Sequence, residues 1–461
     1  MKIAVLNGSP KGESSITLQY VNFIQKKFPQ HEFTVFHVAK GIRRLERDSG
    51  YFKTTIDEID ASDGVLWAFG LWVLLVSAQY MRFIELIAER SAKDAFKNKY
   101  AAALSTSIHY FDHTAHNYIR SVAEDLGMKY TDGLSLDLVD LRSEDKRKTI
   151  ITFADSFFNA IEHTSATSTL FKPLTYSGFT YRPSPVEDPI DAGGKKILVL
   201  TDAAGGTSNL EKMVDRFAQS FSTKSDVTIA RLDDIDIQGG CLGCMRCGYD
   251  YTCQYKDGFT DFYNSRVRTA DIIVFAGSLK GRFLSSRWKT FYDRAFFWNH
   301  TPSLVGKQMG YLISGPLSQV ANLTQYLEAS SFARQDSNHV DIITDEMEDS
   351  LTIDALLHGL ADRLVRFSEE GYIKPKNFLG VGGHKIFRDD IWGRLRMIWQ
   401  ADHRYFKGHG KYDFPQKRYG IRIATAVMML LTKIPGFRKK FYHNLSTMPV
   451  KRMQGIIKKY G

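Results

Sequence analysis

Residues 2–20 read KIAVLNGSPKGESSITLQY, and residues 196–217 repeat the same plan as KILVLTDAAGGTSNLEKMVDRF. Each stretch begins with a short apolar run that predicts a buried strand. A turn rich in glycine and hydroxyl side chains follows, and then a pattern typical of an amphipathic helix. A strand, a turn and a helix in this order begin a βαβ unit, whose strands are parallel.

Two further strands are predicted in each half of the chain, separated by amphipathic stretches. They are SDGVLWAF (62–69) and AAALSTS (101–107) in the first half, and ADIIVFAG (270–277) and MGYLISG (309–315) in the second. We therefore expect an α/β protein with two tandem, doubly wound parallel sheets. The predicted domains are residues 1–162 and 196–373, joined by a linker at 163–195 that is rich in Pro, Ser, Thr and Gly.

The composition is that of a globular protein, with 43% hydrophobic and 24% charged residues among 461. The N-terminal residues break into Gly-Ser-Pro by residue 10, which is not the pattern of a secretory signal. No apolar run approaches the roughly 20 residues that span a bilayer. We therefore expect a cytoplasmic protein.

The positive charge is confined to residues 374–461, which hold 20 Lys and Arg against 4 Asp and Glu, a net charge of +16. The preceding 373 residues hold 41 Lys and Arg against 47 Asp and Glu, a net charge of −6. We expect residues 374–461 to form a basic helical extension, and residues 424–442 resemble an interfacial helix. We favour contact of this extension with a membrane surface or an acidic partner, and we do not expect it to bind nucleic acid. The alternative is that it caps the second domain or forms a homodimer helix.

The first turn, residues 7–17, lies where a strand ends and a helix begins, and such a position favours an anion. It has neither the P-loop nor the dinucleotide-binding glycine pattern. A hydroxyl-rich turn with one lysine suits a phosphomonoester such as that of FMN, although a well-capped helix would use the same residues. The candidate phosphate ligands are Ser9, Lys11, Ser14, Ser15 and Thr17.

GSPKGESSIT (8–17) resembles the phosphate loop of the flavodoxin-like, NAD(P)H-dependent FMN reductase family. In that family a loop after the next central strand covers the flavin ring. FGLW (69–72) takes this place and is followed by the helix VSAQYMRFIELI (76–87). The resemblance therefore implies FMN, a flavodoxin-like fold, and ring contacts from Trp72, Thr106, Ser107 and His109.

The second copy resembles the same family in a different way. LSSRWKTFYDR (284–294) matches the helix after the ring loop, whereas the phosphate loop of this copy has no lysine. The resemblance implies a second flavin site with Thr207, Ser208, Asn209 and Ser278 as ligands.

All four cysteines of the chain lie in CLGCMRCGYDYTC (241–253). In a reducing compartment disulfides are disfavoured, and structural zinc usually uses two separated pairs of ligands. The spacing C-x2-C-x2-C-x5-C is closer to the compact runs that hold a [4Fe–4S] cluster, while zinc and reactive thiols stay open. Iron–sulfur flavoproteins, a branch of the same family, have a compact cysteine motif at this place, and the resemblance implies a cluster on Cys241, Cys244, Cys247 and Cys253.

We therefore expect a flavin-dependent oxidoreductase that moves electrons between NAD(P)H or a low-potential carrier, FMN and a [4Fe–4S] cluster. A small molecule or a protein would serve as electron acceptor, and no acid–base catalyst is singled out. The alternative is a redox or metal sensor whose basic extension binds a membrane or nucleic acid.

Overall fold

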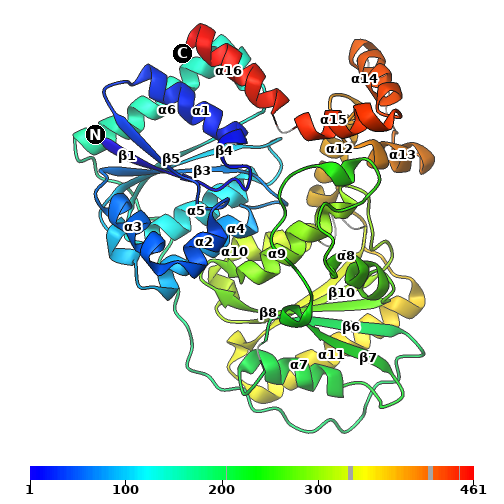
Figure 1. The fold of residues 1–461 in the computed structure, drawn as a ribbon. Helices are drawn as coiled ribbons and strands as arrows, with labels where there is room; N and C mark the ends of the chain where they lie inside the picture. Colours follow the sequence, from blue (N-terminus) through cyan, green and yellow to red (C-terminus); the bar gives the residue numbers. More distant parts are fainter. Residues whose placement is uncertain (204, 331–335, 414–418, 446) are drawn as a thin grey trace. The chain divides into compact units, whose positions relative to one another are not determined.

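Two parallel sheets organise the chain in the computed structural model, which describes residues 1–461 apart from 204, 331–335, 414–418 and 446 (Figure 1). The first sheet has the order β2-β1-β3-β4-β5 and the second β11-β10-β8-β6-β7. All strand pairs within these orders are parallel. The two sheets therefore share one flavodoxin-like topology, which confirms the predicted fold class.

The chain separates into two compact units. The first unit comprises Met1–Pro173, Gly240–Met245 and Pro435–Gly461, and the second comprises Leu174–Gly239 and Arg246–Ile434. The first unit thus includes two short pieces of chain that lie far from its sheet in sequence.

The strands of the first unit follow the predicted runs closely. Residues 3–7 of β1 are buried because helices cover both faces of the sheet, as in parallel sheets generally. The edge strands β2 and β5 are more polar and have no uninterrupted apolar run. The strands are β1 (Lys2–Asn7), β2 (Glu32–Phe36), β3 (Gly64–Gly70), β4 (Tyr100–Thr106) and β5 (Lys129–Leu136).

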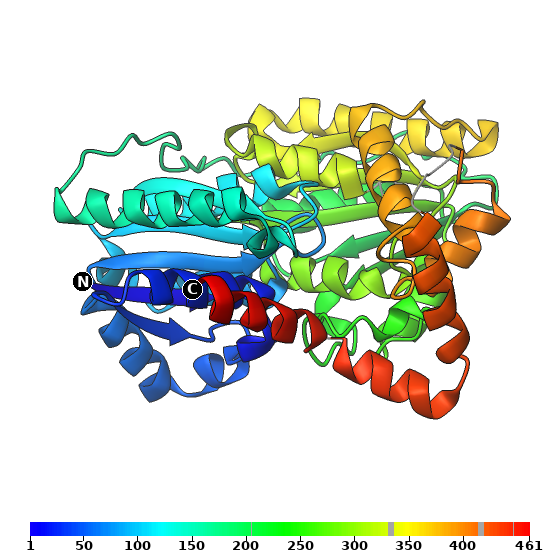
Figure 2. The ribbon, with the colours of Figure 1, turned by 90° about the horizontal axis from the view of Figure 1, so that it is seen from above.

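Helices cover both faces of the first sheet. In Figure 1, α1, α6 and α16 lie over one face and α3, α4 and α5 over the other. Figure 2 shows α16, in red, lying alongside α1. The helices are α1 (Ile16–Lys27), α2 (Ile42–Arg47), α3 (Ser49–Asp60), α4 (Ala78–Glu89), α5 (Asp112–Asp125), α6 (Glu144–Glu162), α15 (Pro435–Asn444) and α16 (Met448–Tyr460).

The second unit repeats this plan and adds a hairpin, in which β9 pairs antiparallel with the end of β8. Its strands are β6 (Lys196–Thr201), β7 (Asp226–Arg231), β8 (Ile272–Lys280), β9 (Phe283–Leu284), β10 (Gln308–Ser314) and β11 (Asn338–Thr344). Its helices are α7 (Asn209–Gln219), α8 (Phe259–Phe262), α9 (Ser286–Ala295), α10 (Ala321–Glu328), α11 (Ser350–Glu370), α12 (Phe378–Trp392), α13 (Gln400–Gly408) and α14 (Tyr419–Leu431).

Part of the predicted linker belongs to the core of the second unit. Tyr181 is fully buried in the hydrophobic cluster of that unit, and its hydroxyl hydrogen-bonds the carboxylate of Asp354. Residues 174–195 therefore do not form a loose spacer, although their composition is typical of one.

The basic extension is helical, as predicted, but it is divided between the two units. The single interfacial helix expected over residues 424–442 is broken, because α14 ends at Leu431 and α15 begins at Pro435. Proline lacks an N–H and is compatible with a first helical turn but not with a helix interior. None of the described helices is long and apolar enough to cross a membrane.

Candidate functional site

The loop after β1 is held by one buried side chain, the amide of Asn7. Its Nδ2 donates to Gly12 O at 3.1 Å, and its Oδ1 accepts from Ser9 N at 3.1 Å. Gly12 has φ +57°, a conformation that favours glycine. The loop is therefore fixed at the carboxyl end of β1, directly before α1.

Ser9 and Lys11 occupy the centre of this loop. Ser9 is buried and its Oγ accepts from Lys11 N at 3.3 Å. Burial lowers the pKa of Lys11, and the thiols of Cys244 and Cys241 act in the opposite direction. The predicted lysine thus lies close to two of the four cysteines within the first unit.

The remaining hydroxyls of the loop have different surroundings. Ser15 is the N-cap of α1, where its side chain accepts from Leu18 N. Thr17 Oγ1 donates to Phe69 O at 3.0 Å and lies 2.8 Å from Thr106 Oγ1, so these two predicted ligands contact each other between α1 and the strand ends. Ser14 is partly exposed in the turn that precedes α1.

Trp72 lies in a tight turn after β3. Trp72 N donates to Leu75 O at 2.7 Å, and Leu75 N donates to Trp72 O at 3.2 Å. Val73 and Leu74 between them have φ +43° and +65°. Left-handed backbone is unfavourable for both side chains, by about 1–2 kcal/mol per residue, and strain of this kind is often found at ligand sites.

The loop after β4 carries the other predicted ring contacts. Ser107 Oγ accepts from His109 N at 2.9 Å and lies 3.0 Å from Ser135 Oγ. The His109 ring lies 3.0 Å from Asp112 Oδ2, and His109 itself has φ +63°. Loops after neighbouring parallel strands share one edge of the sheet, so this loop and the Trp72 turn follow β3 and β4 at the same edge as the loop after β1.

Residues 240–245 also belong to this site. No sequence pattern predicted that this segment would lie here. Gln79 Nε2 donates to Cys241 O at 3.0 Å. A β-carbon built on Gly243 would lie 3.1 Å from Lys11 Cε and 3.7 Å from the Trp72 ring. The first half of the cysteine motif therefore packs against the loop after β1 and against Trp72.

The loop after β6 in the second unit is different in its chemistry. Asp202 stands where the first unit has Gly8, and its carboxylate accepts from Ser278 N at 3.3 Å and from Ser285 Oγ at 2.7 Å. Burial raises the pKa of Asp202. Ser208 is the N-cap of α7 and Thr207 is exposed, while residue 204 of this loop lies outside the described residues.

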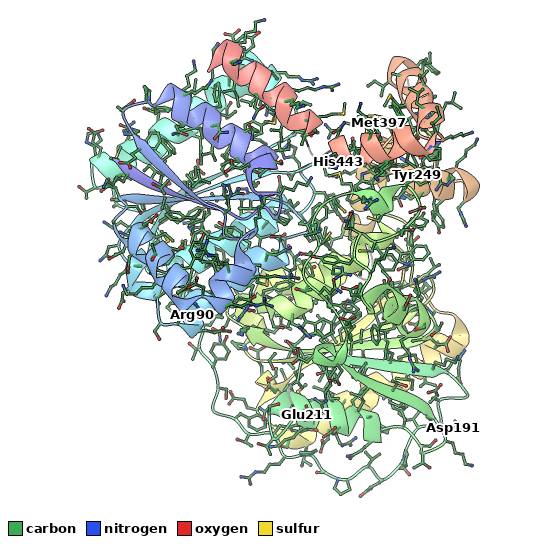
Figure 3. The ribbon with its side chains drawn as sticks, in the orientation of Figure 1. Arg90, Asp191, Glu211, Tyr249, Met397 and His443 are labelled. Atoms are coloured by element: carbon green, nitrogen blue, oxygen red, sulfur yellow. The ribbon has the colours of Figure 1, made fainter. Side chains whose placement is uncertain are left out.

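Asn209 is engaged by the predicted linker. Its Oδ1 accepts from Tyr181 N at 2.9 Å, and its Nδ2 donates to Phe179 O at 2.9 Å and to Asp345 Oδ2 at 3.0 Å. A cleft of about 430 Å³ nearby has Asp345, Glu346 and Glu348 in its wall. Glu211, labelled in Figure 3, adds a further carboxylate in the first turn of α7, paired with Arg231.

The four cysteines are divided between the two units. Cys241 and Cys244 belong to the first unit, whereas Cys247 and Cys253 belong to the second, where Cys247 Sγ lies 3.1 Å from Asn299 Oδ1. No group of three or more His, Cys, Asp or Glu side chains among the described residues is placed to hold a metal ion. The predicted iron–sulfur cluster therefore has no support from the side chains as they stand.

The comparison with protein families gives one match. The model described as NADPH-dependent FMN reductase matches residues 1–140, and no curated protein matches the chain. The match supports a flavin-dependent NAD(P)H oxidoreductase and covers the loop after β1, the Trp72 turn and the loop after β4. The match ends before the cysteine motif and the second unit, so it does not support the iron–sulfur branch or the tandem form of the family.

Solved structures resemble parts of the chain at low identity. A flavoenzyme NAD(P)H:(acceptor) oxidoreductase from Paracoccus denitrificans is 18% identical over 35% of this chain and 97% of its own, with a TM-score of 0.30. An NAD(P)H:quinone oxidoreductase from Methanothermobacter marburgensis is 11% identical over 40% of this chain and 100% of its own, with a TM-score of 0.31.

Proposed function

We propose that this chain is an NAD(P)H-dependent oxidoreductase that holds one FMN in its first unit. The observation that carries the proposal is the loop after β1, fixed by Asn7 and combining a buried serine with a partly buried lysine before a helix N-terminus. Helix N-termini and lysine ammonium groups both favour a phosphate dianion.

The donor set of this loop fits a phosphomonoester. Ser9, Lys11 and Ser14 would contact the phosphate, together with N–H groups of the first turn of α1, which have no acceptor within the helix. Thr17 and Thr106 would act as positioning residues, because their hydroxyls contact each other and join α1 to the ends of β3 and β4.

Two strained loops would border the flavin ring. The left-handed residues Val73 and Leu74 fix the Trp72 turn, and His109 is held by Ser107 and Asp112. When bound, FMN would supply acceptance of a hydride from a nicotinamide and release of electrons singly or in pairs. Because hydride transfer depends on the positions of the two reacting rings, rigid loops at this edge serve the reaction without an acid–base residue.

The second unit is proposed to hold no FMN. Asp202 stands at the position of the glycine that follows the first strand of the first unit. The side-chain amide of Asn209 is already hydrogen-bonded to the backbone of the predicted linker. Asp345, Glu346 and Glu348 line the neighbouring cleft. Carboxylates at this edge repel a phosphate dianion, so the second sheet would not duplicate the phosphate site of the first unit.

The [4Fe–4S] cluster stays a prediction from the spacing of the four cysteines. Cys241 and Cys244, the two cysteines of the first unit, lie beside Lys11, and Gly243 between them lies beside Trp72. Quantification of iron and acid-labile sulfide after purification without air is the test. About four of each per chain would establish the cluster, and their absence with a full complement of flavin would exclude it.

Flavin quantification tests the proposed function directly. The purified chain is saturated with FMN, freed of unbound flavin, and assayed for flavin per chain and for flavin reduction by NADH and NADPH. We expect one FMN per chain and reduction by at least one of the two nicotinamides. A chain that binds no FMN, or binds FMN that neither nicotinamide reduces, would overturn the proposal.

A pair of variants assigns the site to the first unit. Lys11→Ala should weaken FMN binding by about tenfold or more, because a charge-assisted hydrogen bond contributes roughly 1.5–3 kcal/mol. The matched variant Thr207→Ala, in the corresponding loop of the second unit, should leave the affinity unchanged. The reverse result would place the flavin in the second unit.

A further inference from the structure

Helix α14 presents apolar side chains to solvent along one face. Five residues spaced for one side of a helix make up this surface, which we call the α14 face. Their exposed fractions range from 37% to 68%, and they are Tyr419, Ile423, Val427, Leu430 and Leu431. Figure 1 shows α14 projecting beyond α12 and α13.

The opposite side of α14 makes the contacts that hold the helix. The guanidinium of Arg422 lies 3.4 Å from the centre of the Trp392 ring. Thr425 is buried, and Met429 Sδ accepts from Arg396 Nε at 3.1 Å. Arg422, Thr425 and Met429 thus anchor the helix, while the residues of the α14 face, and Ile421 outside that face, are exposed to solvent.

An exposed row of aliphatic side chains of this kind marks an interaction surface. Single exposed apolar residues are common and need no explanation. Here the five residues are neighbours at three- and four-residue spacing on one helix, so they expose a continuous apolar strip.

The charge of this part of the chain indicates the partner. Residues 374–434, the part of the basic extension that belongs to the second unit, carry 13 Lys and Arg against 4 Asp and Glu. Lys433 is exposed just after α14, within the same unit. An apolar strip with cations beside it in sequence matches the boundary between acyl chains and anionic headgroups.

We propose that α14 lies in the plane of an anionic bilayer surface with the α14 face buried among the lipids. None of the described helices can cross a membrane, so the contact is peripheral. Four of the five side chains of the α14 face are aliphatic and have no hydrogen-bonding group, as in the apolar faces of helices that lie at the boundary of headgroups and acyl chains. Tyr419 at the helix start is a residue type enriched at membrane interfaces.

Vesicle flotation of the full chain tests this proposal without reference to flavin. Vesicles of phosphatidylcholine with about 30% phosphatidylserine should carry the chain with them, and vesicles of phosphatidylcholine alone should carry much less, because anionic lipid adds to the attraction. The variant Ile423→Ser/Val427→Ser/Leu430→Ser should lose at least about tenfold in affinity, since burial of each aliphatic side chain contributes to binding. Lys433→Gln should weaken binding by about fivefold.

A matched variant controls for the loss of exposed apolar surface. Val305, Met347 and Leu351 are 58%, 54% and 69% exposed elsewhere on the second unit. Val305→Ser/Met347→Ser/Leu351→Ser should bind vesicles as the parent chain does. Circular dichroism confirms that both triple variants are folded.

Two results would overturn the proposal. One is equal binding by the parent chain and the α14 variant. The other is a parent chain that floats with neither kind of vesicle but forms a dimer that the α14 variant abolishes, as measured by light scattering. That second result would make the α14 face a contact between two copies of the chain.

Discussion

At the scale of single residues, the side chain of Asn7 organises the candidate phosphate loop. It is fully buried at the end of β1 and bonds Gly12 O, Ser9 N and the His37 ring. A sequence pattern marks this asparagine only as the residue before Gly-Ser-Pro. Its three partners lie up to 30 residues away, which is why only the fold reveals its role.

Asn7→Ala should lower the free energy of unfolding by about 1–3 kcal/mol, because it leaves buried loop groups without their hydrogen bonds. It should also weaken FMN binding, since the loop loses its fixed shape. Urea denaturation and a flavin titration measure the two effects. Asn159→Ala is the control, because the Asn159 amide makes an exposed bond to Asp155, and equal effects of the two substitutions would contradict the assignment.

The buried side chain of His116 should make the free energy of unfolding of the chain depend on pH. Burial lowers the pKa of His116 to about 4, and Asp112 and Asp132 oppose this shift only in part. Between pH 6.5 and about 4 the unfolded chain binds a proton at this residue that the folded chain does not. The free energy of unfolding should therefore fall as the pH falls, by up to about 1.4 kcal/mol per pH unit from this residue.

Urea denaturation at pH 7, 6 and 5 checks this expectation. His116→Gln should reduce the dependence of the unfolding free energy on pH by the amount that His116 contributes. The control His163→Gln, at an exposed position, should retain the pH dependence of the parent chain. Identical slopes for the parent chain and His116→Gln would show that His116 titrates normally.

At the scale of elements, α16 shows how a basic segment becomes part of a core. Met453 and Ile457 are 3% exposed and join the hydrophobic cluster formed by β1, α1 and α6. Tyr460 of the same helix lies under the guanidinium of Arg147. The helix therefore contributes its apolar side to the first unit and leaves Lys451 and Lys458 exposed.

Ile457→Ala should destabilise the first unit by about 2–5 kcal/mol, the usual cost of a cavity in a packed core. Denaturant unfolding measures the change. Lys451→Ala, at an exposed position of the same helix, should change the free energy of unfolding by less than about 0.5 kcal/mol. A small effect of Ile457→Ala would mean that α16 is not docked in solution.

At the scale of the whole molecule, one hydrophobic cluster of buried residues lies within the first unit and another lies within the second. We expect FMN at 100 times its dissociation constant to stabilise the unit that binds it by about 2.7 kcal/mol. Calorimetry should therefore show a shift of one unfolding transition and no shift of the other. A shift of both transitions would argue for two flavin sites or for full coupling of the units.

The sequence by itself determined the architecture of this protein. Runs such as KIAVL (2–6) and KILVL (196–200) have enough apolar residues to be buried on both faces, as the central strands of a helix-covered parallel sheet are. The edge strands β2 and β5 were not predicted, because strands with one exposed side need fewer apolar residues. The Trp72 turn was not predicted in shape, because two left-handed residues, Val73 and Leu74, contradict local preference and are held by the fold.

Only the tertiary structure decided how distant segments meet. It brought residues 240–245 against Lys11 and Trp72, divided the four cysteines between two units, and placed linker residues on Asn209. Hydrophobic periodicity reports the burial of each residue and carries no information on which remote segment covers it. Spacing therefore predicted a shared role for the cysteines, whereas their contacts depend on long-range packing that no local pattern encodes.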